Sequence, residues 1–298
     1  MSNSRTLKAG SKDSYSMKIK LKSGVLFLWF VILTIICLLP LYILIINATR
    51  NHSQIVGNVS LIPGSALIDN FKTVTKSQDF LYIFDALAGY RNSAFITICA
   101  TFLTVFFSAL TSYGIHVYDF KLKSISYNVI LLVMMIPVQV TSAGFVNFMN
   151  KIGWTDHYAP LILPAIAAPA VVYFMRSYMK SSFPLDIVEA ARIDGSGEFR
   201  TFLTIAIPMM KPAIAVQAIF AFVQNWNNFY TPNMILITAK VKDKTLPMMI
   251  SAIGASDTLN DYGAKYMAIA LTVLPIAIVY IILSKFIIAG VALGGVKE

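Results

Sequence analysis

The sequence predicts an all-α membrane protein that crosses the bilayer six times, with both termini in the cytoplasm. Three observations predict this class. Of the 298 residues, 57% are hydrophobic and only 13% are charged, whereas soluble domains average about 45–50% apolar and about 25% charged residues. Six stretches approach or exceed the ~20 apolar residues that a helix needs to cross a bilayer. Lys and Arg residues are distributed unevenly between the loops on the two sides of the membrane, as is usual in membrane proteins.

The expected spans follow a basic N-terminal segment, residues 1–24, and lie within one transmembrane domain, residues 25–298. The spans are expected at 25–46, 94–117, 127–149, 158–179, 209–238 and 266–288. The first stretch is longer than the apolar core of a signal peptide, and no small-x-small cleavage site follows it. We therefore expect it to be retained as a span. The fifth is the least regular, because Gln and Asn residues interrupt it.

The positive charges orient the chain. If the N-terminus is cytoplasmic, the loops on its side carry 15 Lys and Arg residues, and the opposite loops carry nine. Cytoplasmic loops are enriched in these residues, so both ends and the loop 180–208 are predicted to be cytoplasmic. The same distribution accounts for the net charge of +10. No basic stripe with interleaved aromatic residues indicates nucleic-acid binding.

The region of the loop 180–208 is rich in charged residues, although the chain on both sides of it is apolar. Eight charged residues lie from Arg176 to Arg200. Pro184 suits a first helical turn, and Ser182 before it is expected to cap the free amides. Asp194 and Gly195 are expected to end this first helix, and a second helix is expected from Ser196 to Pro208. Two apolar stripes are expected: Leu185, Val188 and Ala191 on the first helix, and Phe199, Phe202, Leu203 and Ala206 on the second. The residues alone fit both a docking surface for another protein and an amphipathic connector on the lipid surface.

Several kinds of chemistry are not indicated. No Gly-x-x-x-x-Gly-Lys-Ser/Thr loop is present, so the chain is not expected to hydrolyse ATP. The scattered His and Cys residues have no metal-ligand spacing, and no catalytic residue is predicted. Within the expected spans the only Asp, Glu, Lys or Arg residues are Arg176, Lys211 and Lys285, all near cytoplasmic ends, and the one His, His116, lies at the end of the second span. Ion-coupled carriers place such groups in mid-membrane, so energy for uphill transport must come from outside the chain. A polytopic membrane enzyme, which needs clustered His, Asp or Glu, is disfavoured as well.

Two polar stripes run along expected spans. The hydroxyl residues of the second span are Thr97, Thr101, Thr104, Ser108 and Thr111. Small hydroxyl residues let membrane helices pack closely, so packing is preferred over lining of a path.

In the fifth span, Gln217, Gln224 and Asn228 share one helical face, and Asn225 and Trp226 adjoin it. Amides donate and accept hydrogen bonds, and an aromatic ring can stack on a sugar, so this stripe suits a path for a neutral polyol. The alternatives are contacts between helices and a turn before Pro232.

The stretch EAARIDGSGEFRTFLTIAIPMMKP resembles the Glu-Ala-Ala loop of permeases of binding-protein-dependent ABC importers. The matching residues are Glu189, Ala190, Ala191, Asp194 and Gly195, followed by Ile205-Ala206-Ile207-Pro208. Ile207 stands where the family usually has Leu, a mild departure. NWNNFYTPNMIL, KTLPMMI and the terminal GGVKE are similar to the carbohydrate-importer branch, and most similar to the shorter membrane subunit of maltose-type transporters. The resemblance covers nearly the whole chain.

The resemblance implies a type I ABC importer permease fold in a bacterial cytoplasmic membrane. It implies three partners: a second permease forming a heterodimer, a cytoplasmic ATPase dimer that holds ATP and Mg, and an extracytoplasmic sugar-binding protein. Glu189, Ala190, Ala191, Asp194 and Gly195 would form a coupling helix docked on the ATPase, with a further contact from the C-terminal tail. No cofactor is expected on this chain. The implied solute is a neutral carbohydrate, chiefly an oligosaccharide, with a polyol or glycerol phosphate as the alternative.

Overall fold

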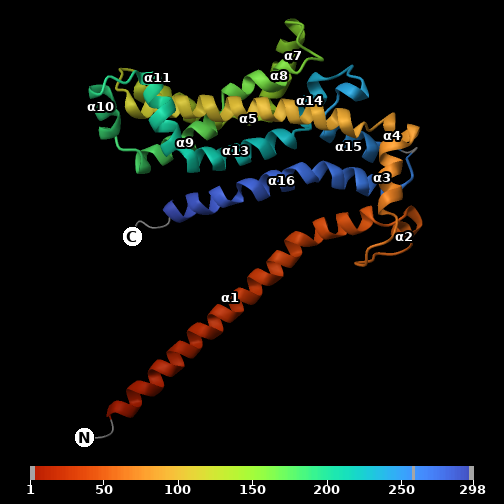
Figure 1. Cartoon of the computed structure of the whole chain (residues 1–298), viewed down its shortest axis with the longest axis horizontal. Helices are drawn as coiled ribbons and strands as arrows, with labels where there is room; N and C mark the ends of the chain where they lie inside the picture. Colours follow the sequence, from red (N-terminus) through yellow and green to blue (C-terminus); the bar gives the residue numbers. More distant parts are fainter. Residues whose placement is uncertain (1–3, 257–258, 295–298) are drawn as a thin grey trace. The chain divides into compact units, whose positions relative to one another are not determined.

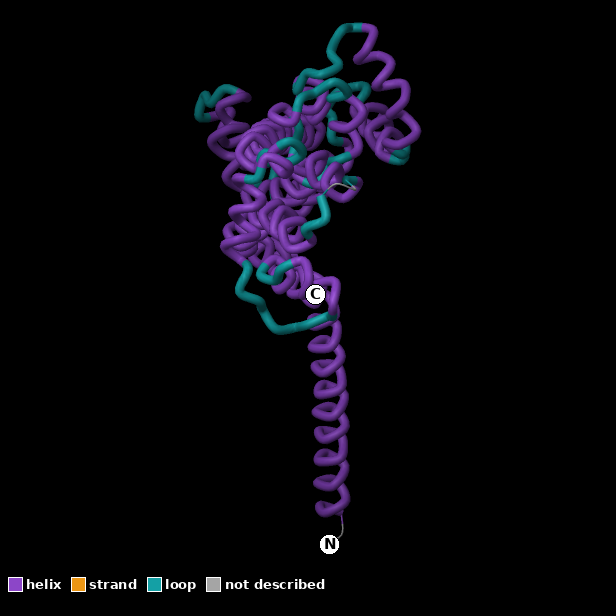
Figure 2. The backbone as a smooth tube through the Cα atoms, turned by 90° about the vertical axis from the view of Figure 1, so that its right-hand side faces the viewer, coloured by secondary structure: helices purple, strands orange, loops and turns teal. Residues whose placement is uncertain are grey.

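The computed structural model describes residues 4–256 and 259–294, and the side chains within these ranges except at 4–21, 138–139 and 283–294. All regular structure in the described residues is helical (Figures 1 and 2). The predicted all-α class is thereby confirmed. The predicted ATPase contact of the C-terminal tail falls mainly on residues 295–298, which lie outside the described residues. The chain divides into two compact units.

The first unit comprises residues 1–71 and 261–270. Its helices are α1 (Ser4–Ala48), α2 (His52–Gly57) and the beginnings of α3 (Leu67–Lys76) and α16 (Tyr262–Gly294). The Asn70 side chain donates to the carbonyls of Ala48 and Arg50, at 2.8 and 2.9 Å. Gly263 packs so closely against the Arg50 carbonyl that a Cβ atom would clash there. These contacts hold the ends of α1, α3 and α16 together. Residues 4–24 of the basic N-terminal segment belong to the same continuous helix as the first expected span.

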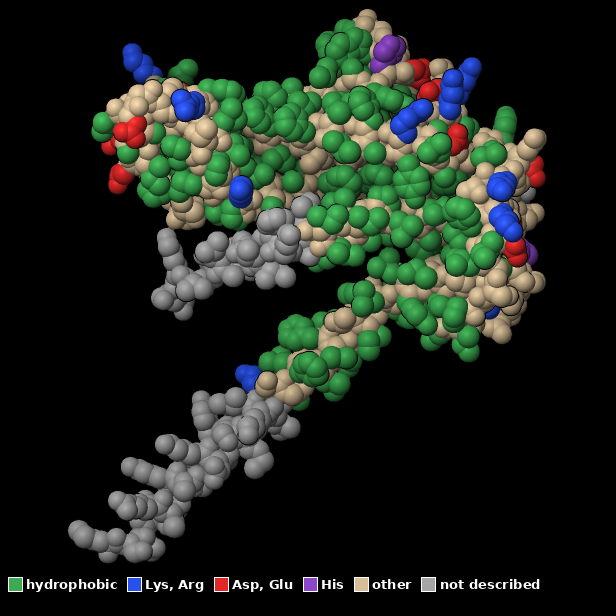
Figure 3. Space-filling view, in the orientation of Figure 1, with side chains coloured by type: hydrophobic (Ala, Val, Ile, Leu, Met, Phe, Trp, Pro, Cys, Tyr) green, Lys and Arg blue, Asp and Glu red, His purple; other side chains and the backbone are tan. Residues whose placement is uncertain are grey.

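The second unit comprises residues 72–260 and 271–298. Its helices are α4 (Gln78–Leu81), α5 (Ala86–Val117), α6 (Lys123–Met134), α7 (Val138–Lys151), α8 (Ala159–Ile162), η1 (Leu163–Ile166), α9 (Pro169–Ser182), α10 (Asp186–Ile193), α11 (Glu198–Thr201), η2 (Phe202–Ala206), α12 (Ile207–Met209), α13 (Lys211–Trp226), α14 (Tyr230–Ile235), η3 (Val241–Asp243) and α15 (Leu246–Ala255), together with the remaining parts of α3 and α16. The long helix α5 is central, because it packs most extensively against α9 and α13 (Figure 1). Hydrophobic side chains cover the surface of this unit between the charged ends near α10 and α14 (Figure 3).

The hydroxyl stripe of α5 faces into the unit. Three of its five residues are buried, namely Thr97, Thr104 and Ser108. The Thr104 hydroxyl donates to the carbonyl of Ala165 at 3.0 Å, and Ser112 near the same face donates to Val172 at 3.0 Å. Only Thr111 is exposed. These bonds to neighbouring backbone agree with the packing interpretation, since small residues bring helices close and hydroxyls bind across the interface.

Four helices in the described residues are long and apolar enough to span a membrane: Lys22–Ala48, Gln78–Val117, Ala159–Ser182 and Tyr262–Ile282. A fifth span results if Glu198–Met209 and Lys211–Trp226, which are bent by 81°, are counted together. The expected number of six spans and the side on which the termini lie therefore stay predictions.

The third expected span, 127–149, is not one continuous helix. It is divided into α6 and α7, of 12 and 14 residues, and each is shorter than the ~20 residues needed to cross a bilayer. Pro137 lies at the break as the N-cap of α7. Its ring removes a donor and disfavours a helical conformation at Ile136.

The fifth expected span, 209–238, also differs from the structure. α13 ends at Trp226, and a separate short helix, α14, begins at Tyr230. The Asn228 side chain accepts from the backbone N–H of Thr231 at 3.2 Å. Asn side chains that bind nearby backbone in this way compete with helix formation. Asn227 and Asn228 thus lie in a turn, whereas Gln217, Gln224 and Asn225 belong to α13.

Candidate functional site: a glycine-hinged segment and a polar cavity

The charged loop folds into two short helices joined by a glycine turn, as predicted. After α10, Gly195 adopts a φ of +76°. Its N–H donates to the carbonyl of Arg192 at 3.0 Å, and the N–H of Ser196 donates to that of Ala191 at 2.9 Å. This pair of bonds is a Schellman motif, which requires a left-handed residue and therefore favours glycine. The predicted stop at Asp194 and Gly195 is confirmed.

The beginning of the segment differs from the prediction. α10 starts at Asp186, two residues after Pro184. Ser182 does not cap it, because this residue is the last of α9, and its hydroxyl pairs with that of Ser181. α9 continues this far because the next residue, Phe183, is buried in the core. A tertiary contact therefore outweighs the local capping preference.

The second helix also starts and ends later than expected. It starts at Glu198 instead of Ser196, whose hydroxyl accepts a hydrogen bond from Thr201. Helical structure continues through Pro208, because the preceding turn, η2, is a π-helix. A proline ring clashes with the carbonyl four residues earlier in an α-helix, and the wider π turn relieves that crowding. The helix then ends at Met209, and the chain bends into α13.

α10 has a buried face and an exposed face. Val188 and Ala191 are buried, with 1% and 6% of their surface exposed. Glu189 and Ala190 are exposed, and Ile193 is 87% exposed although it is large and apolar. Ala191 therefore packs inward. The exposed surface of the helix consists of Glu189, Ala190 and Ile193, with Asp194 and Gly195 also exposed.

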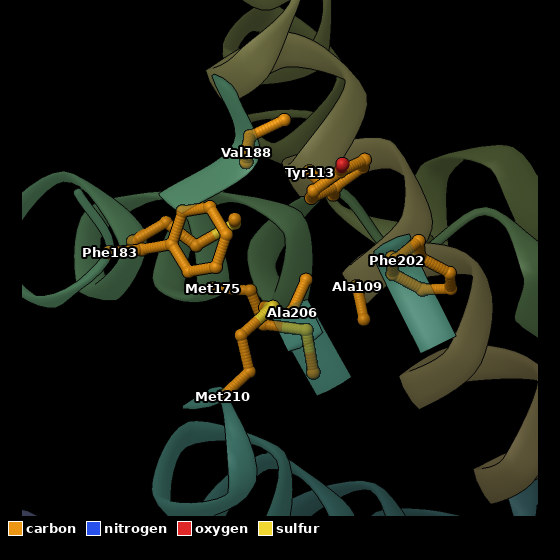
Figure 4. Packing of buried hydrophobic residues seen from close by; sticks show 9 residues of the cluster. Ala109, Tyr113, Met175, Phe183, Val188, Phe202, Ala206 and Met210 are labelled. Carbon is orange, nitrogen blue, oxygen red and sulfur yellow. The ribbon is translucent and has the colours of Figure 1, made fainter. Parts of the chain in front are cut away.

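The residues of the two predicted apolar stripes do not share one environment. Leu185, Phe199 and Leu203 are exposed, whereas Val188, Phe202 and Ala206 are buried. A single contiguous core takes the buried members and anchors the segment to the membrane helices α5 and α9 (Figure 4). Its buried residues are Ala109, Tyr113, Met175, Met179, Phe183, Val188, Phe202, Ala206 and Met210.

One carboxylate joins both helices of the segment to the end of α5. Arg192 Nε lies 2.7 Å from Glu198 Oε1, and the Tyr118 hydroxyl donates to Glu198 Oε2 at 2.6 Å. The Arg192 guanidinium also lies 5.7 Å from the centre of the Tyr118 ring. Burial and the bond to Glu198 raise the pKa of Tyr118 to about 12. Its phenol therefore stays protonated and donating at physiological pH. We call these three residues the clasp.

Amide side chains near the end of α13 line two adjoining cavities of the second unit. Asn225 and Asn228 border both cavities, whose volumes are about 350 and 470 Å³. Gln224 borders the larger one. Three of the five residues predicted to line a solute path are thus brought together.

Gln217 and Trp226 do not line these cavities. Both are buried. The Trp226 indole donates to the Thr272 carbonyl at 3.2 Å, and its ring stacks on Phe222 with centroids 5.7 Å apart. Within the protein, the indole N–H and the face that stacks on Phe222 are occupied. Stacking of this ring on a sugar therefore stays a prediction.

The sequence did not single out the hydroxyl residues of the smaller cavity. Thr141 and Ser142 of α7 line it together with Tyr230 and Thr231 of α14. Ser142 Oγ and the Tyr230 hydroxyl lie 2.9 Å apart. Tyr230 and Thr231 directly follow the amide run, and that adjacency was the available clue. Thr141 and Ser142 come from a distant helix, so only folding places them here.

The residues that line the two cavities include no acid and no Lys, Arg or His. They supply amides, hydroxyls and apolar surface. Within the described part of the chain, no group of three or more His, Cys, Asp or Glu residues is placed to hold a metal. The lining residues can form hydrogen bonds and apolar contacts with a solute, and this combination suits an uncharged solute with many hydroxyl groups.

These features define a helical membrane protein with a polar cavity and, separate from it, an anchored helix with one exposed face. Residues 105–292 match the family described as binding-protein-dependent transport system inner membrane component. The chain belongs to this family, and the prediction of an importer permease is confirmed. As a family of membrane permeases, its members are integral membrane proteins and are generally not enzymes.

Curated relatives extend the similarity to nearly the full length. The chain is 32% identical over 283 residues to the arabinooligosaccharides transport system permease protein AraQ of Halalkalibacterium halodurans, covering 92% of this chain and 96% of that one. It is 26% identical over 280 residues to the trehalose/maltose transport system permease protein MalG of Thermococcus litoralis, covering 93% and 98%.

A solved structure shares the fold. It is the crystal structure of a bacterial ABC transporter involved in the import of the acidic polysaccharide alginate, with a TM-score of 0.73 and 17% identity. The match covers 90% of this chain and 97% of that chain. At this identity the likeness shows the fold alone.

Proposed function

We propose that this chain is the membrane-spanning subunit of an ATP-driven ABC importer that moves a neutral oligosaccharide across the bacterial cytoplasmic membrane. The observation that carries the proposal is the lining of the two cavities, which combines amides and hydroxyls with apolar surface and holds no charged group. Sugars present hydroxyl groups and apolar ring faces, and such a lining meets both. The names of the curated relatives, which refer to arabinooligosaccharides and to trehalose and maltose, support the same solute class.

The lining disfavours the alternative solutes. Glycerol phosphate carries a dianionic group that binds best to Arg, Lys or backbone amides, and the cavities offer no such side chain. An acidic polysaccharide would meet the same lack of cations. A polyol fits the lining chemically, but it is smaller than the combined cavities. An ion-coupled carrier requires ionisable groups near the middle of the membrane, and these cavities lack them.

The energy is proposed to come from partner subunits. α10 would dock on a cytoplasmic ATPase dimer, which binds ATP and Mg. A second permease would form a heterodimer with this chain, and an extracytoplasmic sugar-binding protein would deliver the solute. This chain itself would bind no cofactor and hydrolyse no ATP. The exposed apolar Ile193 beside Glu189 and Ala190 supports a protein partner over a lipid-surface connector, because the buried face of α10 already packs against the membrane helices.

Transport assays in a strain lacking this chain test the proposal. The strain should lose uptake of a labelled neutral oligosaccharide and regain it when the chain is restored. A panel should compare arabino- and malto-oligosaccharides with sorbitol, glycerol 3-phosphate and an oligogalacturonate. We expect competition by neutral oligosaccharides only. Uptake that persists without the partner ATPase but stops when the proton gradient is collapsed would refute an ATP-driven importer.

A further inference from the structure

We propose that Glu198 and Tyr118 are positioning residues: through the clasp they hold α10 and α11 to the end of α5, so that displacement of α10 reaches the cavity. This inference rests on the proposed function, in which α10 receives the motion of an ATPase. The clasp residues belong to three different elements. Arg192 lies in the last turn of α10, Glu198 opens α11, and Tyr118 directly follows α5.

The geometry of the clasp is specific. Both oxygens of the Glu198 carboxylate are used, one by Arg192 at 2.7 Å and the other by Tyr118 at 2.6 Å. Hydrogen bonds to an ionised group are short and about twice as strong as neutral ones. The carboxylate therefore fixes the helix–glycine–helix segment as a unit and fixes that unit to α5. The glycine turn alone would leave the angle between the two helices less constrained.

The clasp is not expected to contribute much to stability. The side chains of Arg192 and Glu198 are 41% and 45% exposed, and ion pairs so exposed add little to folding free energy. The buried aromatic cluster beneath, in which the Tyr113 ring lies 5.3 Å from Phe202 and 6.2 Å from Phe183, carries the packing. Removing the clasp should therefore leave the segment folded and change how rigidly it follows α5.

α5 connects the clasp to the candidate solute path. The helix is continuous from Ala86 to Val117. Thr104, within it, borders the larger cavity and binds the backbone of η1. The clasp lies at the end of the same helix, since Tyr118 is its C-cap. When the clasp holds α10 rigidly to this end of α5, a displacement of α10 would move α5 and with it the cavity wall. Without the clasp, α10 would rotate about Gly195 and leave α5 in place.

The test is the ratio of ATP hydrolysed to solute transported by the complete transporter in proteoliposomes. Tyr118→Phe keeps the ring and removes one hydrogen bond, and Glu198→Gln removes the charge. Each should raise the ATP-to-solute ratio by about 2- to 10-fold, the range that the loss of one hydrogen bond implies. Arg200→Gln, which removes an exposed charge from the same short helix outside the clasp, is the matched control and should leave the ratio unchanged.

A charge exchange provides the rescue. Arg192→Glu combined with Glu198→Arg restores an ion pair, and the Tyr118 hydroxyl can accept from the new guanidinium. The exchange should return the ratio toward the wild-type value, while either change alone raises it. Equal falls in hydrolysis and transport with no change of ratio would overturn the proposal, because they would indicate a loss of assembly or of docking.

A distance measurement separates this inference from the proposed function. Spin labels at Gly197→Cys and Asp119→Cys, with Cys37 and Cys99 replaced by alanine, report the distance between the start of α11 and the end of α5. A Cβ atom at Gly197 meets nothing within 4 Å. Glu198→Gln should broaden the distance distribution in the full complex whether or not a sugar is transported. An unchanged distribution would overturn the clasp. Absence of sugar-stimulated hydrolysis in the wild type would instead count against the proposed function.

Discussion

Gly195 is the residue on which the turn between α10 and α11 depends. Its φ of +76° lies in the left-handed region, where a side chain costs about 1–2 kcal/mol. The sequence predicted this turn because an Asp-Gly pair that ends an amphipathic stretch is a local pattern. The outward direction of Ile193 was not predicted, because the sequence alone does not show which face of α10 meets the core.

Replacing Gly195 with Val should lower uptake by about 5- to 30-fold, since strain of that size opposes the Schellman motif. Insertion into the membrane should be unaffected. The measurement is solute uptake normalised to membrane abundance by immunoblotting. Gly197→Ala is the control, because Gly197 has an ordinary φ of −68° and open space around it. Equal uptake by the two variants would contradict the expectation.

Asn225 and Asn228 are the amides common to both cavities. Replacing either with Ala should weaken the apparent affinity for the sugar by about 2- to 10-fold, the effect of one hydrogen bond to an uncharged group. The half-saturating concentration in uptake assays measures this. Asn227→Ala is the matched control, because Asn227 lies between them but lines neither cavity. If the control weakens affinity as much as the others, the effect belongs to the turn and not to the cavity.

At the scale of elements, the two faces of α10 carry different tasks. The buried face, Val188 and Ala191, holds the helix on the core, and the exposed face is available to a partner. The Glu-Ala-Ala resemblance did not distinguish the tasks of the two alanines. Burial does, because Ala191 packs inward and Ala190 faces outward.

Glu189→Lys and Ile193→Asp should each abolish uptake and release the ATPase from the purified complex. Both change the exposed face of α10, where one reverses a charge and the other places a charge on an apolar contact. Co-purification of the ATPase with a tagged permease measures docking. Arg200→Glu, a charge reversal on the neighbouring helix, should retain the ATPase. Retention by all three variants would favour the lipid-surface connector over docking.

The broken elements show where sequence patterns stop being informative. The apolar stretches at 127–149 and 209–238 each satisfied the length rule, yet each contains a helix end. Pro137 and the Asn227–Asn228 pair ended the helices, and both were visible in the sequence. Membrane helices often contain proline and polar residues without breaking, so composition could not decide between a kink and a break.

At the scale of the whole molecule, the predicted topology awaits measurement. Labelling of single cysteines with a membrane-impermeant maleimide should modify Gly197→Cys only from the cytoplasmic side. Asn58→Cys should be modified from the outside of intact cells. Labelling of both positions from the same side would contradict the six-span arrangement with both ends in the cytoplasm.

The amino-acid sequence by itself determined the all-α membrane class, the glycine-hinged segment and the family, because each depends on composition or on contacts within a few residues. Tertiary structure decided which of the predicted site residues work together. It gathered Asn225 and Asn228 with hydroxyls from α7, withdrew Trp226 into a packed contact, and joined Arg192 and Glu198 to Tyr118. These outcomes depend on helices far apart in the chain, and the pairing of their faces is set by packing that no local pattern records.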